Sequence, residues 1–66
     1  MKFKFRDKVV VTDPGYGYIA EVGTIGEIKD DGYVDQYGDE RYRVRWESTP
    51  TMLWGVHDFS IKKVDT

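Results

Sequence analysis

The chain has 66 residues, no cysteine and a formal net charge of −2, which excludes a disulfide scaffold, a thiolate zinc site and a cysteine nucleophile. No stretch approaches the ~20 apolar residues of a membrane span, the N-terminus lacks the apolar core of a signal peptide, and the negative charge disfavours general nucleic-acid binding. These properties predict one domain over residues 1–66 that is cytoplasmic, does not enter a membrane and is a monomer when free.

Residues 2–11 show apolar and basic side chains in alternation, which predicts a half-buried strand. Its core face would consist of Phe3, Phe5, Val9 and Val11. Its outer face would carry Lys2, Lys4, Arg6 and Lys8. Asp7 interrupts the apolar face, so we expect the strand to bend or to begin there.

Residues 12–20 are predicted to form a long loop, because an Asp-Pro-Gly sequence favours a turn and another glycine follows two residues later. These glycines do not make a phosphate-binding loop. No Gly-Lys-Ser/Thr sequence follows them, and their spacing lacks the third glycine of a dinucleotide-binding motif. Tyr16 and Tyr18 lie in this loop, where we expect their rings to be available to a ligand.

Residues 21–28, with the sequence EVGTIGEI, allow two interpretations. Apolar residues recur here about every three positions, which is close to the helical period. A helix is nonetheless disfavoured, since Gly23 and Gly26 would each cost about 1 kcal/mol in its interior. Glycine within a strand marks a bulge or a bend. The segment is therefore predicted to be a strongly bent strand of a small barrel, with its apolar residues turned inward.

Residues 29–40 hold five carboxylates and a single lysine. The acidic residues are Asp30, Asp31, Asp35, Asp39 and Glu40. Such spacing is compatible with a calcium loop, but an EF-hand needs ligands at fixed alternate positions and flanking helices, which this sequence does not provide. The prediction is a solvated acidic turn without a metal. Tyr33 and Tyr37 lie in the same loop.

Residues 41–46 alternate again, and this pattern predicts a strand with Tyr42, Val44 and Trp46 in the core. The outer face would carry Arg41, Arg43 and Arg45. If this face adjoins the basic face of the first strand, the two form a cationic patch suited to an acidic protein or a phosphate backbone. In the alternative, outward strand positions are simply charged and the acidic loop neutralises them.

The last third of the chain is predicted to hold a short turn at 47–51, a strand at 52–57, a tight turn at 58–60 and a last strand at 61–64. Phe59 would close one end of the barrel. His57 is the only histidine, so neither a histidine metal cluster nor a hydrolase triad can form. Without a nucleophile and base pair, we expect no catalytic residue, no cofactor and no enzymatic activity.

Four segments resemble the SH3-like barrel: DKVVV at 7–11, EVGTIGEI at 21–28, YRVRW at 42–46 and DFSIKKV at 58–64. The resemblance covers nearly the whole chain, which is also similar to KOW-type and Tudor-like domains and to the SH3-like protein of photosystem I. It implies an all-β fold, a small five-stranded SH3-like barrel with a one-turn helix before the last strand. The chain departs from signalling SH3 domains, which open with alanine-leucine-tyrosine, and from the photosystem protein, whose loop between the third and fourth strands is longer.

In SH3-like domains the first two long loops flank a groove, and the resemblance places several aromatic residues of this chain there. They are Tyr16, Tyr18, Tyr33 and Tyr37, with Trp54 as the floor. Aromatic anchors with a charged rim are typical of binding hot spots. The prediction is therefore a non-enzymatic protein-interaction module, either a docking component of an assembly or a regulator or inhibitor of a partner protein. In the alternative, Trp54 completes the core.

The competing function is a nucleic-acid-binding module of the KOW or Tudor-like kind. It would use the basic outer faces of the first and third predicted strands.

Overall fold

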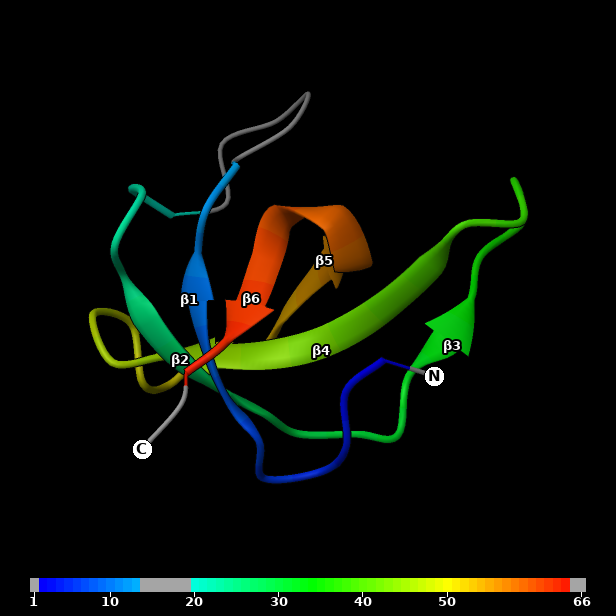
Figure 1. The fold of residues 1–66 in the computed structure, drawn as a ribbon. Helices are drawn as coiled ribbons and strands as arrows, with labels where there is room; N and C mark the ends of the chain where they lie inside the picture. The colour runs from blue at the N-terminus through cyan, green and yellow to red at the C-terminus, as the bar shows by residue number, and fades with distance from the viewer. Residues whose placement is uncertain (1, 14–19, 65–66) are drawn as a thin grey trace.

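The computed structural model describes residues 2–13 and 20–64, and this part of the chain is a small all-β fold. The strands are β1 (Lys8–Val11), β2 (Ile25–Ile28), β3 (Tyr33–Val34), β4 (Glu40–Trp46), β5 (Trp54–His57) and β6 (Ile61–Lys63). A one-turn 3-10 helix, η1 (Asp58–Ser60), stands directly before β6. The predicted all-β class and the one-turn helix before the last strand are confirmed (Figure 1).

All six strands belong to one antiparallel sheet that is organised around β4, the longest strand. On one edge of β4 lie β2 and β3, and on the other lies β5, because Val44 pairs with both Ile28 and Trp54. The order β3-β4-β2-β1-β6 continues the sheet to its far edge. Among the described strands no pairing joins β5 to β6, so the sheet curls without closing, and the short β3 makes six strands where five were predicted.

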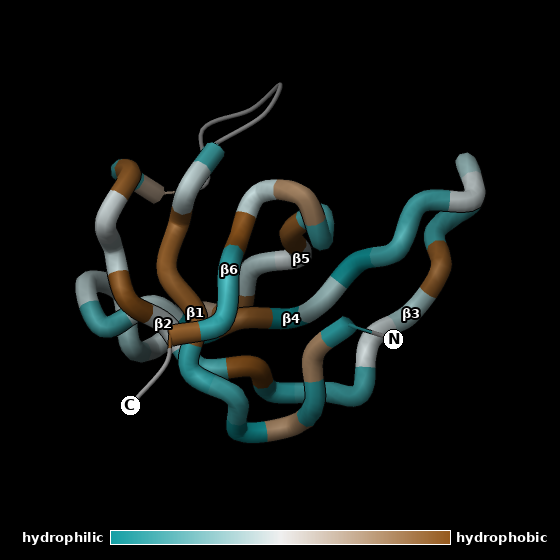
Figure 2. The backbone as a smooth tube through the Cα atoms, viewed as in Figure 1, coloured by the Kyte–Doolittle hydropathy of each residue, from teal (hydrophilic) through white to brown (hydrophobic). Residues whose placement is uncertain are grey.

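The core lies on the inner face of this sheet, and the alternation in β4 decides which side chains reach it. Tyr42, Val44 and Trp46 are buried as predicted. The rest of the core consists of Phe3, Val9, Val11, Ala20, Ile28, Val56 and Ile61. In Figure 2 the hydrophobic segments of β1 and β2 lie together at one end of β4, whereas the end of β4 that joins β3 is hydrophilic.

Residues 2–7 do not belong to the first strand, which begins only at Lys8. Asp7 N donates to Lys4 O at 3.0 Å, and Lys4 N donates to the Asp7 carboxylate at 2.9 Å, so the chain turns here. Arg6 takes the left-handed φ of +76° within this turn. Phe5 is consequently 51% exposed, and its predicted place in the core is wrong.

The segment EVGTIGEI contributes only its second half, Ile25–Ile28, to the sheet. The predicted bend is a turn that comes before the strand, in which Gly23 has a φ of +95° and donates its N–H to Val11 O at 2.9 Å. Val22 lies in this turn and is 65% exposed, so the prediction that all the apolar residues of the segment turn inward is wrong.

Two predictions about the end of the chain are also corrected. β5 begins at Trp54 rather than at residue 52, which leaves Met52 and Leu53 exposed ahead of it. Phe59 does not close the end of the sheet, because its ring is nearly half exposed and stacks on His57 at a centroid distance of 4.8 Å. The part of the chain that the structure describes holds no helix with the length and apolar character needed to span a bilayer.

Candidate functional site

The predicted acidic loop is a hairpin, and two of its carboxylates build it. Asp35 accepts the backbone N–H groups of Tyr37 and Asp39 at 2.9 and 3.0 Å, which closes the turn between β3 and β4. Asp30 accepts Gly32 N–H at 3.0 Å on the approach to β3. Asp30 and Asp35 are therefore structural residues rather than a freely solvated charge. The hairpin extends away from the other strands in Figure 1.

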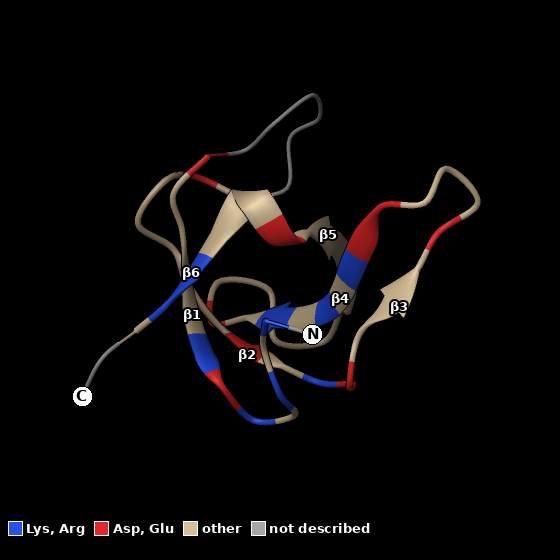
Figure 3. Ribbon diagram, turned by 45° about the vertical axis from the view of Figure 1, so that its right-hand side comes forward, with Lys and Arg blue, Asp and Glu red and all other residues tan. Residues whose placement is uncertain are grey.

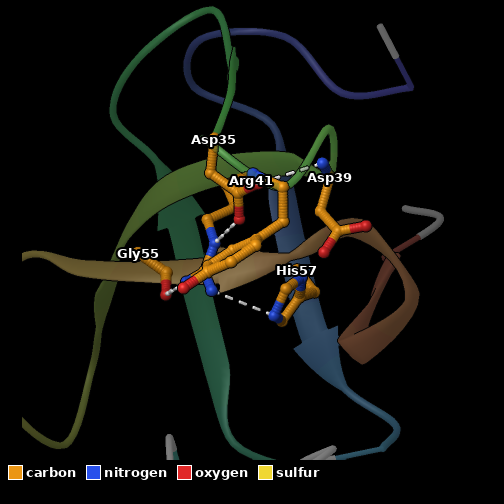
Figure 4. Close-up of polar contacts among 6 residues, drawn as sticks. Asp35, Asp39, Arg41, Gly55 and His57 are labelled. Carbon is orange, nitrogen blue, oxygen red and sulfur yellow. Dashed lines mark hydrogen bonds and ion pairs between the residues drawn. The ribbon is translucent and has the colours of Figure 1, made fainter.

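Arg41 connects this hairpin to β5 (Figure 4). Its Nε donates to Asp35 Oδ2 at 2.7 Å, its Nη1 to Gly55 O at 3.2 Å, and its Nη2 lies 3.1 Å from His57 Nε2. A guanidinium only donates hydrogen bonds, so His57 accepts through Nε2 and its own proton resides on Nδ1. The hydrogen bond from Arg41, with the backbone N–H of Asp39 as a second cause, holds the pKa of Asp35 below its ordinary value.

Asp35, Asp39 and His57 are also the one group of residues with the chemistry of a metal site in the described part of the chain. Their donor atoms lie within 4.8 Å of one another, and carboxylate and imidazole are ligands that divalent transition metals accept. The Arg41 guanidinium is bonded to two of the three residues. A metal ion would have to compete with this resident positive charge.

The other arginines of β4 also face carboxylates. Arg43 Nη1 lies 3.1 Å from Asp30 Oδ2, and Arg45 Nη2 lies 3.5 Å from Glu27 Oε1. Glu27 pairs with Lys29 as well, and this hydrogen bond lowers the pKa of its carboxyl. Figure 3 shows red segments on β2 and in the hairpin beside the blue positions of β4.

The two predicted basic faces do not adjoin. Only Lys8 of the row Lys2, Lys4, Arg6 and Lys8 lies on a strand, and β2 stands between β1 and β4. In register, Glu27 lies between Lys8 and Arg45 and places a negative charge in the middle of the row. The alternative that neighbouring acids neutralise the outward arginines describes this surface.

The predicted aromatic groove is divided between two faces of the sheet. Tyr33 pairs with the outward-facing Arg41, and its ring lies beneath the Arg43 guanidinium at 4.7 Å. With Tyr37, which is 78% exposed, it lines an open hollow on the outer side of the hairpin. Trp54 pairs with buried Val44 and shares the inner face instead. Tyr16 and Tyr18 lie outside the described residues.

Trp54 packs against the core and at the same time lines a second hollow of about 290 Å³. We refer to it as the indole pocket, lined by Ala20, Glu21, Thr24, Trp46, Ser48, Thr49 and Trp54. The two interpretations of Trp54 therefore both hold in part. Trp46 and Thr49 had no predicted role at a site, because Trp46 is in phase with the core residues of β4 and an isolated threonine carries no sequence signal.

The indole pocket contains three polar atoms that are buried and have no hydrogen-bond partner among the described residues. They are Trp46 Nε1, Trp54 Nε1 and Thr49 Oγ1. Buried polar groups in folded proteins are nearly always paired, so three such atoms around one small hollow distinguish it from the other surfaces of the molecule.

Comparison of the chain with protein-family models, with curated proteins and with solved structures gives no match. The functional assignment therefore rests on the geometry of the chain itself.

Proposed function

We propose that the protein is a small, non-enzymatic protein-interaction module whose partner docks at the indole pocket and on the two residues that precede β5. The observation that carries this proposal is the exposure of Met52 and Leu53, 52% and 56%, immediately before the half-buried Trp54. Adjacent large apolar side chains beside an aromatic hollow are typical of interfaces, where a buried aromatic anchor is surrounded by apolar contacts.

The predicted partner contacts Tyr16 and Tyr18 are compatible with this location, because their loop precedes Ala20 of the pocket in sequence. We also assign the chain to the SH3-like barrels as part of the proposal. The strand markers in the sequence and the one-turn helix before β6 support that assignment, and the fold hosts many binding modules.

The charges support a protein partner over nucleic acid. Each arginine of β4 faces a carboxylate, and Lys2 and Lys63 pair with Asp58 and Asp7. A phosphate backbone would have to compete with these carboxylates for the cations that bind it.

The test compares two variants as bait for proteins of the host cell. Met52→Ser combined with Leu53→Ser removes the exposed apolar surface beside the pocket, whereas Val34→Ser removes an equally exposed apolar side chain on β3. We expect the wild type and Val34→Ser to capture the same protein, and the double variant to capture at least about tenfold less of it while its amide spectrum stays folded. Equal capture by all three folded baits would contradict the proposed surface.

A further inference from the structure

The three unpartnered atoms of the indole pocket indicate the kind of group that would bind there. An indole Nε1 donates a hydrogen bond and accepts none, and a threonine hydroxyl can donate as well. Trp46 is only 1% exposed, so bulk water does not reach its side chain freely. A buried donor without an acceptor raises the free energy of the folded state, and an acceptor brought by a ligand removes that cost. The pocket is therefore complementary to hydrogen-bond acceptors.

The charge of the pocket selects among acceptors. Glu21 is the charged residue among the described residues that line it, and neither lysine nor arginine is present there. A carboxylate or phosphate would be repelled by Glu21 with no cation to compensate, since like charges a few ångströms apart interact strongly in a partly dry site. A neutral carbonyl oxygen has no such penalty.

The size and surroundings of the pocket favour a piece of polypeptide over a small cofactor. Its volume of about 290 Å³ lies at the lower end of the range for small-molecule sites. Met52 and Leu53 extend its apolar border along the chain that enters β5. An extended segment that inserts a carbonyl group would therefore find apolar surface for its neighbouring side chains.

The route into the pocket passes the turn that follows β4. The turn is held by hydrogen bonds from Thr49 N to Trp46 O at 3.1 Å and from Met52 N to Thr49 O at 3.2 Å, and its residues 50–53 are exposed. Because the donor atoms are enclosed, the entering oxygen reaches them when this turn shifts outward.

We infer that the indole pocket binds a neutral backbone carbonyl of an extended segment of the partner protein, held by the N–H groups of Trp46 and Trp54 and the hydroxyl of Thr49. This inference rests on the proposed function and specifies the chemistry of the partner at that surface.

The test uses the fact that the chain has only two tryptophans, both in the pocket. Their two indole N–H signals in a nitrogen-15 spectrum of the whole protein are followed while N,N-dimethylacetamide, a neutral acceptor with no N–H, is added. Sodium acetate at the same concentration and ionic strength is the charged comparison. We expect both signals to shift and saturate with the amide, and acetate to bind at least tenfold more weakly. Acetate binding as tight as the amide, or shifts that never saturate, would overturn the inference.

Two variants remove one donor each without removing the shape of the pocket. Thr49→Val and Trp54→Phe should each raise the apparent Kd for dimethylacetamide at least threefold, whereas Thr51→Val, the same change at an exposed neighbour outside the pocket, should leave it unchanged. Wild-type affinity in both folded donor variants would also overturn the inference. Partner capture that depends on Met52 and Leu53, without any amide binding, would refute the carbonyl and leave the proposed function standing. Amide binding without such capture would do the reverse.

Discussion

Gly26 shows how a single residue sets the spacing between β2 and the core. It pairs with Trp46 across the sheet, and a Cβ atom at this position would lie 2.7 Å from both Trp46 Cζ3 and Val44 Cγ1 and closer still to Trp46 Cε3. Neither side chain has room to withdraw, because both are fully buried. Only glycine lets the indole ring lie directly against the strand.

We therefore expect Gly26→Ala to lower the free energy of unfolding by about 2 to 3 kcal/mol, the usual cost of overpacking a core. Urea unfolding followed by tryptophan fluorescence measures it. Gly55→Ala is the matched control, because its Cβ would meet only the hydroxyl end of the Tyr33 side chain, at 2.7 Å, which can move. An equal loss in the two variants would show that the contact with Trp46 is not the cause.

Asp35 makes the stability of the hairpin dependent on pH. Its pKa is held below the ordinary value of 3.8, mainly by the hydrogen bond from Arg41. Because its folded-state pKa is lower than its unfolded-state pKa, the unfolded chain binds more protons between the two values. The contribution of the pair is thus complete above the unfolded pKa and is lost as the pH falls through the folded pKa.

Arg41→Gln should accordingly bring the pKa of Asp35 back toward its ordinary value and make the loss of stability in acid less steep. A carbon-13 titration of the Asp35 carboxyl measures the first effect, and unfolding curves below about pH 4 measure the second. Arg43→Gln serves as the control, because Arg43 pairs with Asp30 instead. An unchanged titration of Asp35 in Arg41→Gln would refute the assignment of the cause.

At the scale of elements, the N-terminal segment illustrates where alternation predicts burial and where it does not. The pattern of residues 2–11 continues through residues 2–7, yet the Asp7 side chain bonds to the backbone of Lys4 and replaces the strand with a turn. Short polar side chains often compete with strands in this way. In β4, where arginines alternate with apolar residues and no such competitor intervenes, the same reasoning predicts the buried face correctly.

This N-terminal segment is instead attached to β4 through the hydroxyl of Tyr42. Lys2 N and Phe3 N donate to it at 2.7 and 3.2 Å, and the ring of Phe3 packs edge-to-face on the tyrosine at 5.1 Å. Burial also raises the pKa of this hydroxyl, so it stays protonated at neutral pH.

Tyr42→Phe should lower the free energy of unfolding by about 1 to 2 kcal/mol, since it leaves two backbone donors without their acceptor. Amide exchange by NMR should accelerate at Phe3 and stay slow at Val44, in the centre of β4. Unchanged protection at Phe3 would mean that the packing of its ring, rather than the hydroxyl, fixes the segment.

At the scale of the whole molecule, the sheet order decides which surfaces exist. The sequence predicts charged outer faces on individual strands, but only the order of strands shows that β2 brings Glu27 between Lys8 and Arg45. Likewise, the pairings place Tyr33 and Trp54 on opposite faces, although both are aromatic residues near strand ends. The indole pocket draws on residues 20–24, 46–49 and 54, and no local pattern joins segments so distant in the chain.

The measurement that tests the account most directly is an NMR spectrum of the labelled protein before and after addition of an extract of its host cell. The account predicts that the indole N–H signal of Trp54 and the methyl signals of Met52 and Leu53 broaden together, while Tyr37 and Arg43 keep their signals. Broadening confined to Tyr37 and Arg43, or produced equally by added nucleic acid, would contradict it.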